Sequence, residues 1–139
     1  MNFTSYRYVI DAYAWIEYFR ASKAGEAAKQ YIESEESATP TIVVSEVSRK
    51  LQNEVILGNE TQAGKTQRLE FMRTATEIID LDFETAAKAG ETDSRMKRER
   101  RGWGLADSII LCTANAVEGK VVTGDEHFRG LEEVILIKK

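Results

Sequence analysis

The chain has 139 residues and a formal net charge of −4, which suits one compact core but not a protein that binds nucleic acid by charge alone. Its single cysteine, Cys112, excludes an intrachain disulfide, and no apolar run approaches the roughly 20 residues of a membrane span. We therefore expect one domain over residues 1–139, without a leader segment or membrane partner, located in the cytoplasm.

Short β-branched stretches alternate with helical patterns along the chain. Strands are predicted over residues 6–11, 37–39, 77–81, 120–123 and 134–137. Helices are predicted over residues 12–20, 22–35, from about 42 to the mid-50s, 65–76, 82–101, and from 104 towards the glycine turn at 119. This alternation predicts right-handed crossovers and an α/β/α sandwich around a mainly parallel, roughly five-stranded sheet.

Residues 104–128 form the most informative stretch. The helix that follows Gly104 is apolar on several faces, so it should lie deep in the domain. Asp107 lies in its first turn, and Asp125 comes just after the strand that follows it. A helix runs antiparallel to the next strand of such a sheet, so these two carboxylates should meet at one edge.

Two further acids are predicted at that edge. Asp11 ends the first strand, and Glu46 lies in the first two turns of the helix after the second strand. Ligands of parallel α/β sheets bind beyond the carboxyl ends of the strands. Each of the four acids also has a local explanation. Asp11 suits an N-cap and Glu46 a solvated helix face, whereas Asp107 suits a partner of the helix dipole and Asp125 a turn former.

Convergence of these four acids predicts a metal site. Four carboxylates brought together repel one another and raise one another's pKa unless cations neutralise them. The ligands are oxygens, without paired Cys or His, which favours Mg²⁺ or Mn²⁺ over Zn²⁺. Carboxylates that hold such ions suit the hydrolysis of phosphodiesters, because a bound ion makes a water nucleophilic without a side-chain base.

The motifs that carry these acids resemble the PIN domain and, within it, the VapC-like toxin ribonucleases of toxin–antitoxin pairs. In order they are Val9-Ile10-Asp11, Ser45-Glu46, LADSII over 105–110 and VVTGDEHF over 121–128, and they span nearly the whole chain. The resemblance implies that the four acids are catalytic and bind metal, Asp11 and Asp107 directly and Glu46 and Asp125 through water. It also implies a supporting hydroxyl at Thr123. The family commonly has a hydroxyl residue directly after the first acid, where this chain has Ala12.

The resemblance further implies a metal-dependent endoribonuclease that leaves 5′-phosphate and 3′-hydroxyl ends on its RNA substrate. It implies a homodimer neutralised by a small antitoxin that inserts a basic side chain among the acids. One alternative is a catalytically weak PIN-like RNA-binding or RNA-processing module, which Ala12 and the net acidity favour. A receiver or phosphatase of doubly wound fold ranks lower, because Tyr13 replaces a second Asp and Asp80 lies inside a strand run.

A basic run follows at the end of the helix predicted to end near residue 101. Its cations complement the helix dipole, and they are also candidates for binding RNA phosphates: Arg95, Lys97, Arg98, Arg100 and Arg101.

Several other residues in or near the site receive structural interpretations. His127 is interpreted as a loop residue in preference to a general base, since metal supplies the nucleophile, and Glu126 as a solvated turn acid. Trp103 is interpreted as a packing residue at the helix junction in preference to a base-stacking platform, and Cys112 as a core residue.

Overall fold

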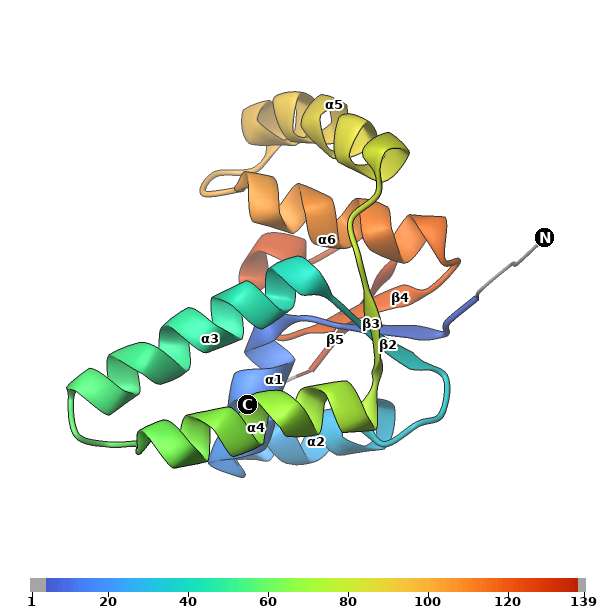
Figure 1. The fold of residues 1–139 in the computed structure, drawn as a ribbon. Coiled ribbons are helices and arrows are strands. Elements are labelled where there is room, and N and C mark those ends of the chain that lie inside the picture. The colour runs from blue at the N-terminus through green and yellow to red at the C-terminus, as the bar shows by residue number, and fades with distance from the viewer. Residues whose placement is uncertain (1–4, 138–139) are drawn as a thin grey trace.

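A computed structural model, which describes residues 5–137, contains a five-stranded sheet in the order β3-β2-β1-β4-β5 (Figure 1). The strands are β1 (Tyr8–Ile10), β2 (Ser37–Pro40), β3 (Glu77–Ile79), β4 (Lys120–Thr123) and β5 (Val134–Leu136). Every neighbouring pair runs parallel. The predicted α/β/α fold with about five parallel strands is confirmed.

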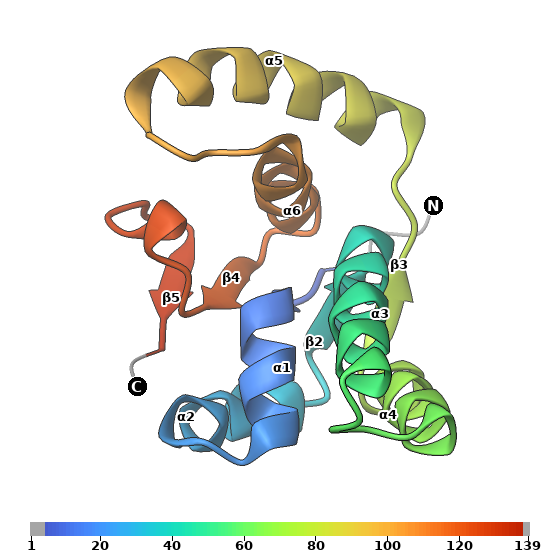
Figure 2. The same cartoon turned by 90° about the vertical axis from the view of Figure 1, so that its left-hand side faces the viewer.

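Helices cover both faces of the sheet. Figures 1 and 2 show α5 and α6 on one face of the sheet and α1 and α2 on the other, while α3 and α4 form an antiparallel pair beside β2 and β3. The helices are α1 (Ala12–Arg20), α2 (Lys23–Ile32), α3 (Thr41–Ile56), α4 (Gln62–Ala75), α5 (Phe83–Glu99), α6 (Leu105–Ala116) and the short 3₁₀ helix η1 (Glu126–Phe128). Within residues 5–137, none is long and apolar enough to cross a membrane.

Side-chain caps explain where the helices depart from the predicted bounds. The Thr61 hydroxyl accepts the Gly64 N–H at 2.9 Å, so α4 begins at Gln62, ahead of the predicted start at residue 65. Ser22 and Asp82, which were predicted to lie inside helices, are instead the N-caps of α2 and α5. Both helices also end before the predicted residue.

The core lies between the sheet and its two helical layers. Val9 and Ile10 of β1 and Val121 and Val122 of β4 are fully buried, as expected of central parallel strands. The middle of α6, from Ile110 to Ala114, is buried, in agreement with its apolar sequence, and Cys112 is a core residue. The sheet centre and α6 therefore form a rigid base for residues at the ends of β1 and β4.

Trp103 closes the junction between α5 and α6. Its side chain is buried, its ring centroid lies 5.1 Å from that of Phe128, and its indole N–H donates to Ser108 Oγ at 2.7 Å. A buried indole with a satisfied N–H packs in the core and does not offer a face to a base. The interpretation of Trp103 as a packing residue is confirmed, and its contacts help to fix the start of α6.

The strand order places a topological switch between β1 and β4. The chain winds from β1 to β2 and β3 on one side, then returns to add β4 and β5 on the other. Ligand crevices of such sheets open at this switch, outside the carboxyl ends of the strands. The order also contradicts the receiver alternative, because receivers have the order 2-1-3-4-5.

Candidate metal centre

Asp11 lies at the switch point, directly after β1, with a side chain only 5% exposed. Its backbone N–H donates to the Val122 carbonyl of β4. Its Oδ1 accepts the Ala12 N–H at 2.7 Å, and its Oδ2 accepts the Thr123 hydroxyl at 2.6 Å. Each oxygen keeps a further lone pair, so the carboxylate is held in place and still able to bind a cation.

Asp107 and Asp125 face each other across the same edge. Asp107 Oδ2 accepts the Gly104 N–H at 2.9 Å, which caps the start of α6. Asp125 Oδ1 accepts the His127 N–H at 3.0 Å and caps η1. Asp107 and Asp125 therefore each cap a local helix, and their carboxylates also lie close together.

His127 belongs to the same cluster, which the sequence interpretation as a plain loop residue missed. Its Nδ1 lies 3.2 Å from Asp125 Oδ1 and 3.8 Å from Asp107 Oδ2. One ligand atom from each of these three residues fits within 4.8 Å of the others. The available signal was the spacing, because a residue two positions after a turn-forming Asp is brought back beside that carboxylate.

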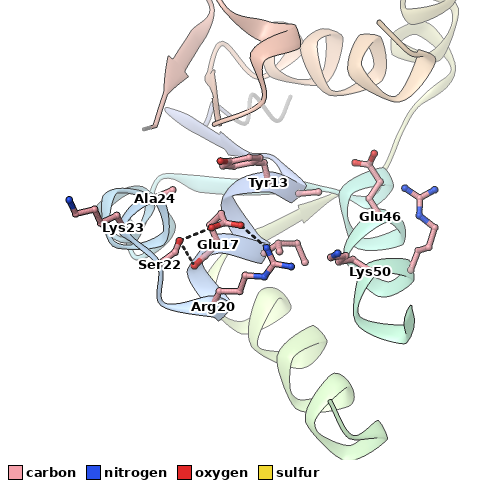
Figure 3. A pocket seen from close by; sticks show the side chains of 11 residues that line it. Tyr13, Glu17, Arg20, Ser22, Lys23, Ala24, Glu46 and Lys50 are labelled. Atoms are coloured by element: carbon pink, nitrogen blue, oxygen red, sulfur yellow. Dashed lines mark hydrogen bonds and ion pairs between the residues drawn. The ribbon is translucent and has the colours of Figure 1, made fainter. Parts of the chain in front are cut away.

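Glu46 projects from the second turn of α3, and Figure 3 shows its carboxylate turned away from Lys50. Its Oε1 is buried and has no hydrogen-bond partner among the residues that the structure describes. A buried oxygen left unsatisfied costs about 1–3 kcal/mol, and more if it is charged. The expected solvated helix face for Glu46 is wrong for this oxygen.

The electrostatics of Asp11 show that the acids are close enough to interact. Burial raises the pKa of Asp11 from 3.8 to about 6, although the hydrogen bonds from Thr123 and Ala12 lower it. The charges of Asp125 and Asp107 raise it further.

Glu46 responds to the same charges from the other side of the cluster. Burial raises its pKa from 4.5 to about 7, and the charges of Asp11 and Asp107 add to the rise. Arg49 lowers the pKa and Asp125 raises it. All four predicted acids therefore share one electrostatic environment, and the pKa of Asp107 is raised as well, chiefly by burial.

The donor set fits a hard divalent cation. It consists of the carboxylates of Asp107 and Asp125 and the imidazole of His127, with Asp11 and Glu46 close enough to interact with these acids electrostatically, and carboxylate oxygens suit Mg²⁺ or Mn²⁺. The unpartnered Glu46 oxygen and the raised pKa values are what such a cation would relieve. Asp107, Asp125 and His127 are the residues whose ligand atoms lie within 4.8 Å of one another, and Thr123 orients Asp11.

The basic run has a structural role at one position. Arg100 Nη1 donates to the carbonyls of His127 at 3.0 Å and Arg129 at 2.7 Å. Arg100 therefore anchors the loop that carries Asp125 and His127. In the same loop, Glu126 pairs with Arg129 at 2.6 Å and is a rim acid.

A model of the PIN domain family matches residues 8–134 of the chain. No curated protein sequence matches it. Solved structures with the same fold include a toxin–antitoxin complex from Klebsiella pneumoniae, with 22% identity, a TM-score of 0.68 and coverage of 91% of this chain and 94% of that one.

Two further structures have a similar degree of likeness. VapBC2 from Rickettsia felis, bound to a DNA fragment from its promoter, has 17% identity and a TM-score of 0.70, covering 93% of this chain and 96% of that one. VapC20 from Mycobacterium tuberculosis, described as a toxin that cleaves the sarcin-ricin loop, has 16% identity and a TM-score of 0.69, covering 91% and 98%. At these identities the likeness shows a shared fold.

Proposed function

Because the chain belongs to the PIN domain family, we propose that it is a divalent-metal-dependent endoribonuclease and the toxin of a toxin–antitoxin pair. The fold is shared with toxin–antitoxin complexes and with a toxin that cleaves the sarcin-ricin loop. Fold alone does not assign an activity, so the proposal depends on the acids at the switch point.

The observation that carries the proposal is the buried, unpartnered Oε1 of Glu46 beside three aspartates. A structural carboxylate in a protein interior is normally paired with a hydrogen-bond donor or a cation. Here the charges that surround Glu46 most closely include Asp11 and Asp107, which oppose its ionisation. A bound divalent ion is the partner that would make this arrangement favourable at neutral pH.

In the proposed reaction, the acids would hold the metal ion and Thr123 would orient one of them. Bound Mg²⁺ or Mn²⁺ supplies a more acidic water and neutralises charge on the phosphodiester. Asp11 and Asp107 hold the cation from β1 and α6, and Glu46 and Asp125 complete the site from α3 and the loop after β4. Thr123 keeps Asp11 in one orientation through its 2.6 Å hydrogen bond.

The proposed partners follow from the charge of the site. A small antitoxin that inserts a basic side chain among the four acids would compete with metal for the same carboxylates. We further propose a homodimer acting on RNA in the cytoplasm, with residues 1–139 as a single PIN-like domain.

A ribonuclease assay in Mn²⁺ tests the proposal. Wild type should cleave RNA, while Asp107→Asn, which keeps the size of the side chain, should lose at least about a hundredfold in rate. EDTA should abolish the wild-type activity, and Zn²⁺ should not replace Mn²⁺. Equal cleavage by both proteins, or by wild type with and without EDTA, would refute the function.

Calorimetric titration with Mn²⁺ separates a nuclease from the catalytically weak RNA-binding module. The nuclease should bind Mn²⁺ in a manner that Asp11→Asn removes. Heat of binding that is the same in both proteins would favour the weak module.

A further inference from the structure

A groove of about 600 Å³ opens beside the acid cluster, between α1, the start of α2 and α3 (Figure 3). At one end it is lined by Ala12 and Glu46, next to the candidate metal centre. At the other end it reaches Ser22 and Ala24. The groove is therefore continuous with the site where the proposed reaction takes place.

The α3 wall of the groove is basic. Arg49 and Lys50 lie three and four residues after Glu46, so they follow it on the same face of α3. Both side chains are exposed. The Lys50 side chain makes no hydrogen bond or ion pair with any residue in the described range 5–137, and Arg49 lies near enough to Glu46 to lower the pKa of Glu46.

The α1 wall adds Arg20, which forms an ion pair with Glu17. Arg20 lies 3.1 Å from Glu17, and Glu17 also accepts the Ser22 hydroxyl at 2.7 Å. Figure 3 shows the guanidinium of Arg20 facing across the groove towards Lys50, whereas Lys23 points away from it. The groove thus places Arg20, Arg49 and Lys50 around one channel.

The far end of the groove is the capped start of α2, where Glu17 already accepts the Ser22 hydroxyl. Ser22 caps α2 by accepting the Gly25 N–H, and the groove ends at this helix N-terminus. Among the described residues, the cations of the groove on α1 or α3 that form no ion pair are therefore Arg49 and Lys50 on the α3 wall, beside the acid cluster.

Resting on the proposed function, we propose that this groove binds the backbone of single-stranded RNA next to the scissile bond, with Arg49 and Lys50 on the phosphates. A cluster of four acids repels a polyanion, so the substrate needs cations immediately beside it. Glu46 and Lys50 are separated by about 6 Å along α3. A strand whose cleaved phosphate lies at the acids would therefore have its neighbouring phosphates within reach of these side chains.

Fluorescence anisotropy with a labelled single-stranded RNA oligonucleotide, measured at several salt concentrations, tests the groove. The measurement uses Asp107→Asn protein in EDTA, so that no cleavage occurs. Adding Arg49→Gln and Lys50→Gln should weaken RNA binding about tenfold at 0.1 M salt and reduce the slope of log affinity against log salt by about 1.4. Single substitutions should each reduce the slope by about half as much.

A matched pair of substitutions controls for net charge. Lys29→Gln with Lys88→Gln removes two exposed cations from α2 and α5, outside the groove, and should leave the affinity and slope near those of the parent protein. Equal thermal midpoints for the two double variants exclude a folding defect as the cause.

The outcomes separate the groove from the function. If both double variants bind RNA like the parent, the groove proposal fails, and a protein segment is the better occupant, even if wild type cleaves RNA. Equal weakening by both pairs also overturns it, because net charge then explains the binding. If only the groove variant loses affinity while wild type shows no Mn²⁺-dependent cleavage, the groove stands and the proposed activity fails.

Discussion

The hydroxyl of Thr123 donates a 2.6 Å hydrogen bond to Oδ2 of Asp11, joining two residues that are 112 positions apart in the chain. The same hydroxyl oxygen accepts the Asp125 N–H at 3.0 Å. One buried side chain therefore connects the ends of β1 and β4 and the loop that follows. It fixes the relative positions of Asp11 and Asp125, whose negative charges repel each other.

Removing this hydroxyl should weaken metal binding without unfolding the protein. Thr123→Val keeps the shape but leaves Asp11 and the Asp125 N–H without their partner. Loss of a residue that orients a metal ligand typically costs about 10–100-fold in affinity, so calorimetry should show a Mn²⁺ dissociation constant raised by that factor. Thr123→Ser, which keeps the hydroxyl, should stay within a few-fold of wild type. Equal loss in both variants would assign the effect to packing.

Asp11→Asn should stabilise the metal-free protein while removing its response to metal. Burial opposes the charge on Asp11, so a neutral side chain of the same size relieves a cost that is present at pH 8. In EDTA at pH 8, the thermal midpoint should rise by a few degrees. Millimolar Mn²⁺ should raise the midpoint of wild type but not of the variant. A lower midpoint for the variant in EDTA would contradict this account of the site.

The stabilising effect of neutralising the site should depend on pH. The folded-state pKa values, about 6 for Asp11 and about 7 for Glu46, exceed the ordinary values of 3.8 and 4.5. Below about pH 3 both groups are protonated in the folded and unfolded states, so they contribute no difference. As pH rises, the unfolded chain loses these protons first, and the folded state loses stability until about pH 7.

Urea unfolding of wild type and of Asp11→Asn/Glu46→Gln, both in EDTA, measures this dependence. The difference in unfolding free energy should grow in favour of the variant between pH 4 and 7 and level off above it. A difference that is constant over this range would show that the two carboxyls have ordinary pKa values in the folded protein.

His127 should contribute to metal binding, because it lies in one cluster with Asp107 and Asp125. Its Nδ1 lies within 4 Å of Asp107 Oδ2 and Asp125 Oδ1. We expect His127→Ala to raise the Mn²⁺ dissociation constant about tenfold at pH 8. Glu126→Ala, one position away and removing an acid that pairs with Arg129, is the control and should leave it nearly unchanged. Equal constants for wild type and His127→Ala would restore the interpretation of His127 as a loop residue.

Arg100 should hold the loop after β4 in place, whereas Arg101, the next residue of the basic run, should not. Arg100→Ala removes donors to the carbonyls of His127 and Arg129, which is worth about 1–3 kcal/mol. Hydrogen exchange should accelerate at residues 126–131 in this variant. Arg101→Ala, at an exposed position, should leave the exchange unchanged. Comparable acceleration in both variants would exclude a specific anchor.

The order and type of the elements could be predicted from the sequence because their signals are local. The apolar run in α6 and the β-branched stretch of β4 predicted burial, and both are buried. The edge shared by Asp107 and Asp125 followed from the antiparallel course of a helix and its next strand. Residues 62–64 at the start of α4 were missed, because the Thr61 cap gives a weaker signal than hydrophobic periodicity.

The finer geometry of the site depends on contacts between distant parts of the chain. The hydrogen bond from Thr123 to Asp11 and the unpartnered oxygen of Glu46 arise from strand order, which local propensity does not encode. His127 was interpreted as a loop residue because a bound metal can supply the nucleophile without it, whereas in the structure Gly102, with φ of 80°, leaves space for its ring against the α5–α6 connection.

An anomalous difference map from crystals grown with Mn²⁺ tests the central claim most directly. The account predicts a peak at the switch point between β1 and β4, within coordination distance of Asp11 and Asp107, that disappears in Asp107→Asn crystals. A map from crystals grown at a saturating Mn²⁺ concentration that shows no peak among Asp11, Glu46, Asp107 and Asp125 would contradict the account.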